Sequence, residues 1–168
     1  MMKICDFKVY GFSGQGIRTF VKLLEKAYML SGWHVFGSFT VGSPGKPASG
    51  YVRVSNRKVL DKGPSENPDF VIIMDKDFYS LEDIKDRGVI IVNSSEPVNF
   101  KKELKNKKVK IYSIDATTLA LGLGLSMPNT VMLGIVAKKA GLKINTVKKA
   151  ASGMNESNHK AIEEGFKK

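Results

Sequence analysis

The hydrophobic positions along the chain change period several times, and each change predicts an element. Residues 4–10 alternate in character, as expected for a first strand. Residues 17–28 then repeat apolar side chains at helical spacing, and Gly32 is placed to end that helix. The opening unit is therefore a strand, a glycine-rich turn and a helix. Further strands are predicted at residues 33–41, 68–75, 88–93 and 108–115. Residues 42–50, with three glycines and two prolines, are predicted as a loop, and residues 51–60 as one strand or as a strand and a turn.

The remaining segments predict helices, with Asn129, Asn145 and Asn155 as candidate N-caps and Gly141 as a candidate stop. These helices are expected at residues 77–87, 116–124, 127–141, 144–153 and 155–168. Strands that alternate with helices indicate the α/β class, here a Rossmann-like layered domain with a mainly parallel sheet flanked by helices. The chain has no internal repeat and no long linker, so residues 1–168 are expected to form a single domain.

The composition argues against several classes of protein and of site. No apolar run reaches the roughly 18 residues of a membrane span, and the N-terminus has no secretory signal, so a cytoplasmic protein is expected. Cys5 is the only cysteine, which excludes an internal disulfide and a cluster held by four cysteines. His34 and His159 lie far apart in the sequence without metal-ligand spacing. The sequence therefore predicts no metal site, and no local motif supports a nucleophilic triad.

The net charge of +11 favours an anionic partner. Nucleic-acid readers rely on arginine forks, however, and only four of the 27 basic residues are arginine, so a nucleic-acid partner is not expected. The lysine-rich segment 101–110 is interpreted as a solvated connection before a strand. A docking site for an acidic protein is the sharper alternative for the same segment.

The loop after the first strand carries the strongest candidate chemistry. Gly11, Gly14 and Gly16 surround Gln15, the only glutamine of the chain. A strand, a glycine turn and a helix can bind a phosphate on the free amides of the helix start. The spacing G-x-x-G-x-G is neither the dinucleotide pattern nor a Walker loop, and a tight structural turn remains the alternative. The Gln15 carboxamide could hold the loop, a partner chain or a ligand.

The stretch YGFSGQGIRTFVKLLEKA resembles the glycine motif that opens the gamma subunits of 2-oxoacid:ferredoxin oxidoreductases, the best known of which act on pyruvate. In that motif Ser13 replaces a glycine, and the matching residues are Gly11, Gly14, Gln15, Gly16 and Ile17. The stretches PDFVIIMD, GVIIVNSS, IDATTLALGLG, PNTVMLGIVAKKAGL and NHKAIEEGF follow in the order of the family. The resemblance therefore covers nearly the whole chain.

The resemblance implies a gamma subunit that positions ligands or partners in a complex converting a 2-oxoacid, by default pyruvate, to an acyl-coenzyme A with electrons passed to ferredoxin. It implies thiamine diphosphate, Mg²⁺ and iron–sulfur clusters held by partner subunits of the alpha, beta and delta types, and coenzyme A near this chain. The family's Arg-Gly-Gly element is absent, and Lys46 lies where it would fall. The candidate ligand-binding residues are Gly11, Ser13, Gly14, Gln15, Gly16, Lys46 and Asn129.

Two other functions remain open at this point. The first is a stand-alone Rossmann-like module that binds a nucleotide or coenzyme. The second is an accessory protein for nucleic acid, whose binding would weaken steeply with salt. Under each of these three hypotheses, the chain itself is expected to carry neither an iron–sulfur cluster nor a thiamine diphosphate motif.

Overall fold

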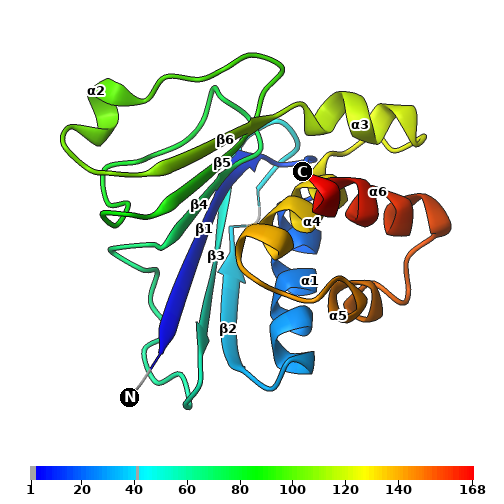
Figure 1. The fold of residues 1–168 in the computed structure, drawn as a ribbon, viewed down its shortest axis with the longest axis horizontal. Coiled ribbons are helices and arrows are strands. Elements are labelled where there is room, and N and C mark those ends of the chain that lie inside the picture. The colour runs from blue at the N-terminus through cyan, green and yellow to red at the C-terminus, as the bar shows by residue number, and fades with distance from the viewer. Residues whose placement is uncertain (1–2, 41) are drawn as a thin grey trace.

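The computed structural model describes residues 3–40 and 42–168. Residue 41, the last of the predicted strand 33–41, lies outside the described residues, as do residues 1 and 2. Within the described part, the strands form one six-stranded sheet in the order β2-β3-β1-β4-β5-β6 (Figure 1). These strands are β1 Ile4–Phe12, β2 His34–Phe39, β3 Pro47–Ser55, β4 Phe70–Ile73, β5 Val89–Asn93 and β6 Lys110–Ile114.

The sheet is mainly parallel, as predicted, with one reversed strand. β1, β4, β5 and β6 pair in parallel, whereas β3 is antiparallel to both of its neighbours, β1 and β2. β3 also begins at Pro47, inside the segment that the sequence predicts as a loop. Pro47 is the first residue of the strand, where a missing amide is tolerated. A reversed strand of this kind follows from the short β2–β3 connection, since parallel strands need a much longer crossover.

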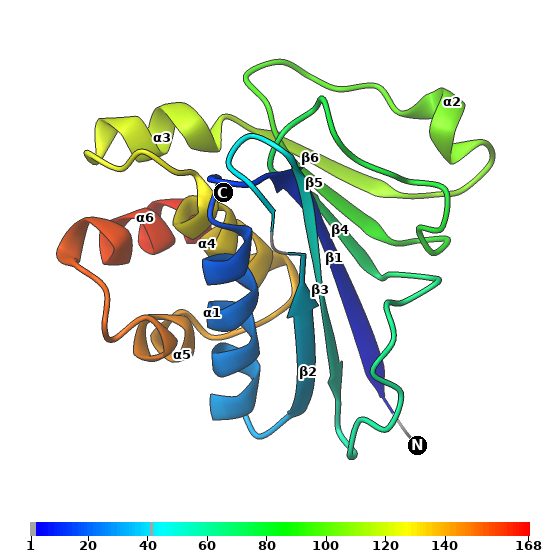
Figure 2. The same ribbon diagram turned by 180° about the vertical axis from the view of Figure 1, so that it is seen from behind.

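One face of the sheet is covered by helices (Figures 1 and 2). α1 packs on it along the side that carries Phe20, Val21 and Leu24, as its apolar spacing predicts. α4 is buried around most of its circumference, because it lies between α1, α6 and the sheet. The helices on this face are α1 Ile17–Leu30, α3 Ala116–Gly122, α4 Asn129–Lys139, α5 Ile144–Ala150 and α6 Glu156–Lys167.

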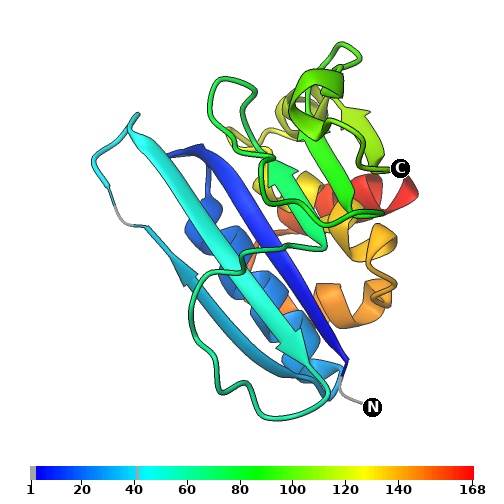
Figure 3. The same cartoon turned by 90° about the vertical axis from the view of Figure 1, so that its left-hand side faces the viewer.

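The other face is covered mainly by connecting segments, with one short helix, α2 Lys101–Leu104, on top (Figure 3). The helix predicted at 77–87 is wrong, because this stretch forms turns. Phe78 packs against Tyr10 and the adjacent Tyr79 packs against Phe100, with ring centroids 5.8 and 5.3 Å apart. Through these two contacts Phe78 and Tyr79 pack against a second hydrophobic core, distinct from the one that contains α1 and α4. Leu81 and Ile84 are buried in this second core. Tertiary packing therefore overrides the local helical pattern.

The predicted caps have mixed outcomes. Asn155 caps α6, since its Oδ1 accepts a hydrogen bond from the Asn158 amide at 3.0 Å. Asn129 and Asn145 were expected to cap α4 and α5, and both expectations are wrong: the N-cap positions belong to Pro128 and Lys143. Both asparagines lie one or two residues further on, inside their helices. Among the described helices, no helix is long and apolar enough to cross a membrane.

Candidate functional site

The glycine loop lies at the carboxyl end of β1, where the chain turns into α1. Gly14 has φ 107° and Gly16 has φ 80°, and Gly16 is the N-cap of α1. L-residues with a side chain rarely adopt this left-handed region, so the turn requires glycine at both positions. A Cβ added at Gly14 would meet no atom within 4 Å. The loop therefore exposes its backbone at Gly14 to an incoming group.

Gln15 holds the loop in place. Its Oε1 accepts a hydrogen bond from the Phe12 amide at 2.8 Å, and its Nε2 donates to Asp75 Oδ2 at 2.9 Å. The other carboxylate oxygen of Asp75 accepts from the Asp77 amide at 3.1 Å, which closes a turn after β4. The carboxamide thus ties the end of β1 to the end of β4. Gly11 leaves the space it needs, since a Cβ there would lie 2.5 Å from Oε1.

Asn129, the first residue of α4, supports the loop through a hydrogen bond. Its Nδ2 donates to the Gly16 carbonyl at 3.3 Å, and its Oδ1 accepts from the Thr130 amide at 2.9 Å. The side chain is buried, with only 4% of the residue exposed. A Cβ at Gly16 would lie 2.2 Å from Asn129 Nδ2, so the two residues are fitted to each other. The fold brings together two candidate residues that are 113 positions apart.

Lys46 reaches the loop through its backbone. The Ser13 amide donates to the Lys46 carbonyl at 2.8 Å, and the Gly45 amide donates to the Ser13 carbonyl at 2.9 Å. The turn at 43–46 is therefore paired with the glycine loop, and the Lys46 side chain extends from it into solvent. All of the predicted site residues, Gly11, Ser13, Gly14, Gln15, Gly16, Lys46 and Asn129, gather around this one turn.

A cavity of about 300 Å³ opens on one side of the loop, and we call it the loop cavity. It is lined by Ser13 and Gly14 of the loop, Arg18 and Thr19 of the first turn of α1, and Thr40 of the β2–β3 connection. The guanidinium carbon of Arg18 lies 5.7 Å from the centre of the Phe39 ring. A cation beside the positive end of a helix favours a bound anion. Sequence reasoning missed Arg18, although its position two residues after Gly16 could have indicated it.

A larger cavity of about 550 Å³ opens on the other side, at the carboxyl ends of β4, β5 and β6. Asn93 organises it: Nδ2 donates to the Met74 carbonyl at 2.9 Å and to Thr117 Oγ1 at 2.8 Å. Asp115 faces the same cavity, and hydrogen bonds from the Thr118 amide and hydroxyl lower the pKa of its carboxyl. Sequence reasoning missed both residues. Open α/β sheets bind ligands at this edge, which was the available signal.

Metal and thiol chemistry find no support in the described residues. Across residues 3–40 and 42–168, no three His, Cys, Asp or Glu side chains are grouped so that they could hold a metal ion. Burial raises the pKa of the Cys5 thiol to about 12, with smaller contributions from the charges of Asp69 and Asp6. A thiol with so high a pKa is a poor nucleophile at neutral pH.

Comparisons with known proteins match this chain to one family and to oxidoreductase subunits. Residues 6–168 match the family model described as pyruvate ferredoxin/flavodoxin oxidoreductase. The common gamma subunit of the pyruvate/ketoisovalerate oxidoreductases of Pyrococcus furiosus is 33% identical, over 97% of this chain and 96% of that protein. Pyruvate synthase subunit PorC of Methanocaldococcus jannaschii is 30% identical, over 96% of this chain and 94% of the relative.

A solved structure agrees with these sequence matches. The crystal structure of pyruvate oxidoreductase subunit PORC from Thermotoga maritima superposes with a TM-score of 0.85 at 26% identity, covering 99% of this chain and 97% of that one. The fold, the family model and the relatives all extend over nearly the whole chain. The chain therefore belongs to the pyruvate ferredoxin/flavodoxin oxidoreductase family, as the resemblance of its glycine motif predicted.

Proposed function

We propose that this chain is the gamma subunit of a 2-oxoacid:ferredoxin oxidoreductase, with pyruvate as the default 2-oxoacid. The observation that carries the proposal is the match over nearly the full length of the chain to gamma subunits of oxidoreductases that act on pyruvate. The complex oxidatively decarboxylates the 2-oxoacid, transfers the acyl group to coenzyme A and passes electrons to ferredoxin. This chain is an oxidoreductase subunit that is inactive alone.

Most of the redox chemistry belongs to other subunits in this proposal. A chain with a single cysteine cannot supply the thiolates of an iron–sulfur cluster. Partner subunits of the alpha, beta and delta types hold the thiamine diphosphate, the Mg²⁺ and the clusters, and ferredoxin docks on the complex. Cofactors carry the chemistry and the protein supplies position and electrostatics. The cytoplasmic location stays a prediction.

The loop cavity is the part of this chain that we assign to coenzyme A. Its residues fit an anionic group, because Arg18 and the start of α1 supply positive charge and Gly14 leaves the backbone open. The loop is also rigid before any ligand arrives, since Gln15 and Asn129 hold it through their side chains. Lys46 does not line the cavity, but its carbonyl pairs with Ser13 of the loop, so its side chain supplies a nearby point charge where the family has an arginine.

The test uses the assembled complex and two matched variants of α1. Arg18→Gln removes the cation that lines the loop cavity, and Lys26→Gln removes an exposed cation two turns further along the same helix. We expect Arg18→Gln to raise the KM for coenzyme A by about tenfold or more, because a charge-assisted hydrogen bond is lost. Lys26→Gln should behave like the wild type. Equal KM values for all three proteins would exclude a coenzyme A site at the loop, while leaving the subunit assignment intact.

The alternative is a stand-alone coenzyme-binding module, which a Rossmann-like sheet also permits. The native mass of the tagged chain, isolated from its own cells, separates the two. A complex that contains thiamine diphosphate and iron supports the subunit. A free chain of 18.5 kDa that binds coenzyme A supports the module.

A further inference from the structure

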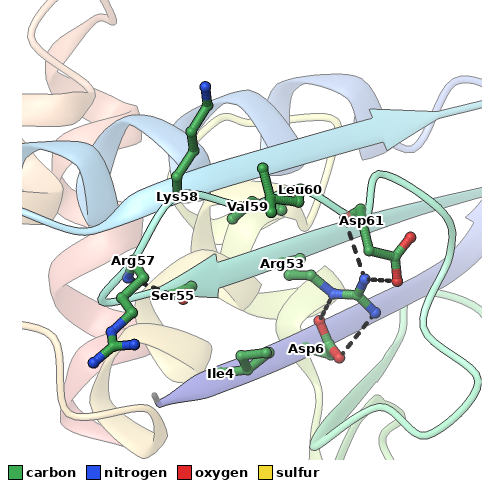
Figure 4. A pocket seen from close by; sticks show the side chains of 9 residues that line it. All are labelled: Ile4, Asp6, Arg53, Ser55, Arg57, Lys58, Val59, Leu60 and Asp61. Carbon is green, nitrogen blue, oxygen red and sulfur yellow. Dashed lines mark hydrogen bonds and ion pairs between the residues drawn. The ribbon is translucent and has the colours of Figure 1, made fainter. Parts of the chain in front are cut away.

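A third cavity lies at the opposite end of β1 from the glycine loop. Its volume is about 570 Å³, and it lies over the start of β1, the end of β3 and the segment that follows β3 (Figure 4). That segment runs across the sheet face that the large helices leave uncovered (Figure 3). We call this cavity the β3 pocket. It shares no lining residue with the loop cavity.

The floor of the β3 pocket is a network centred on Arg53. Its Nε donates to Asp6 Oδ1 at 2.8 Å, and its Nη1 pairs with Asp61. Ser65 Oγ donates to Asp6 Oδ2 at 2.8 Å. The side chains of Arg53 and Asp6 are only 12% and 11% exposed, and the hydrogen bond to Asp6 raises the pKa of Arg53. The network therefore clamps the segment after β3 onto the sheet in one position.

The clamped segment displays an apolar side chain to solvent. Leu60 is 80% exposed, the highest value among the large hydrophobic residues that the structure describes as exposed. Ile4, which is 45% exposed, and Val59 line the same pocket. A single exposed leucine is ordinary, but an apolar pocket with a rigid wall is a feature of binding surfaces. Nothing within the described part of the chain covers it.

The rim of the pocket is positively charged. Arg57 and Lys58 are exposed, and neither forms an ion pair with any described residue. Figure 4 shows both side chains extending away from the Asp6–Arg53 pair. Arg53 pairs with both carboxylates of the pocket, Asp6 and Asp61, and sets one positive charge against their two negative ones. Arg57 and Lys58 add two more positive charges, so the charged side chains that line the pocket sum to +1. The charge left for an incoming group is therefore positive, which selects a negatively charged partner.

We propose that the β3 pocket is the docking site for an acidic segment of another subunit of the complex. An aliphatic or aromatic side chain of that segment packs against Ile4 and Leu60, and its carboxylates pair with Arg57 and Lys58. The proposal rests on the subunit function proposed above. A second copy of this chain is a poor occupant, because it would bring together two proteins of net charge +11.

The first experiment measures how tightly the chain is held in the purified complex. Leu60→Ser and Arg57→Glu are compared with two controls on α1: Met29→Ser, which truncates a side chain that is 63% exposed, and Lys26→Glu, which reverses an exposed charge. We expect Leu60→Ser to weaken retention of the chain about tenfold or more, since a buried apolar contact is lost. Arg57→Glu should weaken retention most at low salt, where charge pairs are least screened. Retention equal to that of the controls would overturn the proposal.

The second experiment identifies the occupant. A photoreactive amino acid replaces Val59 in the purified complex, and the cross-linked peptide is sequenced by mass spectrometry. An acidic segment of another subunit supports the proposal. A cross-link to a second copy of this chain overturns it, and so does coenzyme A that protects the position from cross-linking. If the unmodified chain is isolated without other subunits, the proposed function fails. If the two pocket variants, Leu60→Ser and Arg57→Glu, assemble into the complex as the unmodified chain does, only the docking site fails.

Discussion

Gln15 is the residue with the most specific structural task in the glycine loop. It accepts a hydrogen bond from the Phe12 amide and donates one to Asp75. A carboxamide can do both at once, whereas a carboxylate accepts only. The only glutamine of the chain is therefore a positioning residue, which holds the backbone that faces the loop cavity.

Replacing Gln15 tests this task. Gln15→Ala leaves the Phe12 amide and Asp75 without their partner, and we expect a loss of about 1–3 kcal/mol in the free energy of unfolding. Gln15→Glu keeps an acceptor for the Phe12 amide but sets a second carboxylate against Asp75. That repulsion raises the folded-state pKa of the new carboxyl, so its penalty is absent below its ordinary pKa and grows as the pH rises above it. Urea unfolding at pH 4 and pH 8 measures the difference.

A second substitution controls for the Gln15→Glu result. Adding Asp75→Asn restores a donor opposite the new carboxylate, so the double variant should regain stability at pH 8 and lose the pH dependence. If Gln15→Glu unfolds at the same urea concentration as the wild type at both pH values, the repulsion is absent and the loop is not held in this way.

The Cys5 thiol gives a second residue-scale prediction. With a pKa of about 12, only about one thiol in ten thousand is ionised at pH 8 in the folded protein. Iodoacetamide should therefore label the folded protein far more slowly than the urea-unfolded one, which mass spectrometry measures. The raised pKa also means that the unfolded chain loses this proton first, so stability should fall as the pH rises above about 9. Equal labelling rates would contradict the partial burial of Cys5.

At the scale of elements, the contact between α4 and α6 depends on two glycines. A Cβ added at Gly134 would lie 2.1 Å from the Ile162 carbonyl oxygen, and one added at Gly165 would lie 2.0 Å from the Val131 carbonyl oxygen. Both obstacles are helix backbone, which cannot swing aside as a flexible side chain can. The two helices thus approach so closely that no larger residue fits between them.

Alanine substitutions test that packing. Gly134→Ala and Gly165→Ala each gain up to about 1 kcal/mol in helix propensity, but overpacking costs about 1–3 kcal/mol or more, so both should lower the melting temperature. Gly122→Ala is the matched control, because it also lies in a helix and its Cβ would meet nothing within 4 Å. The control should be neutral or stabilising. A control that destabilises as much as the two test variants would refute the packing argument.

At the scale of the whole molecule, the loop cavity and the β3 pocket lie at opposite ends of β1. Along β1 the nearest lining residues of the two cavities are Asp6 and Phe12, which lie roughly 20 Å apart. The sheet thus presents one surface that fits an anionic ligand and another that fits an acidic chain. The two surfaces use different cations, Arg18 at one and Arg57 with Lys58 at the other.

Because the two cavities are far apart, we expect a substitution in one to leave the function of the other unchanged. Effects at sites more than about 10 Å apart add, so the double variant Arg18→Gln with Leu60→Ser should combine the loss of coenzyme A affinity with the loss of retention, without further coupling. The measurement compares both quantities in the two single variants and the double variant. A double variant whose coenzyme A affinity depends on the Leu60 substitution would show that the sites are coupled through the sheet.

Much of this protein could be predicted from its sequence, because burial leaves a local periodic mark. The strands at residues 4–10, 68–75 and 88–93 were predicted from alternating character or apolar runs. The order of strands and helices along the chain predicted the α/β class, and the glycine motif indicated the family. Each of these inferences needs only neighbouring residues and a stated spacing. The motif also identified the turn around which the candidate site residues gather.

Only the tertiary structure decided which residues meet. The hydrogen bonds of Asn129 to Gly16 and of Gln15 to Asp75 span 113 and 60 positions, and the Arg53–Asp6 pair needs β3 to lie reversed beside β1. The turns at 77–87 also replace a predicted helix because their aromatic side chains have partners elsewhere in the chain. A local pattern records that a side chain is buried or polar, but its partner depends on strand order and direction, which are settled by packing over the whole fold.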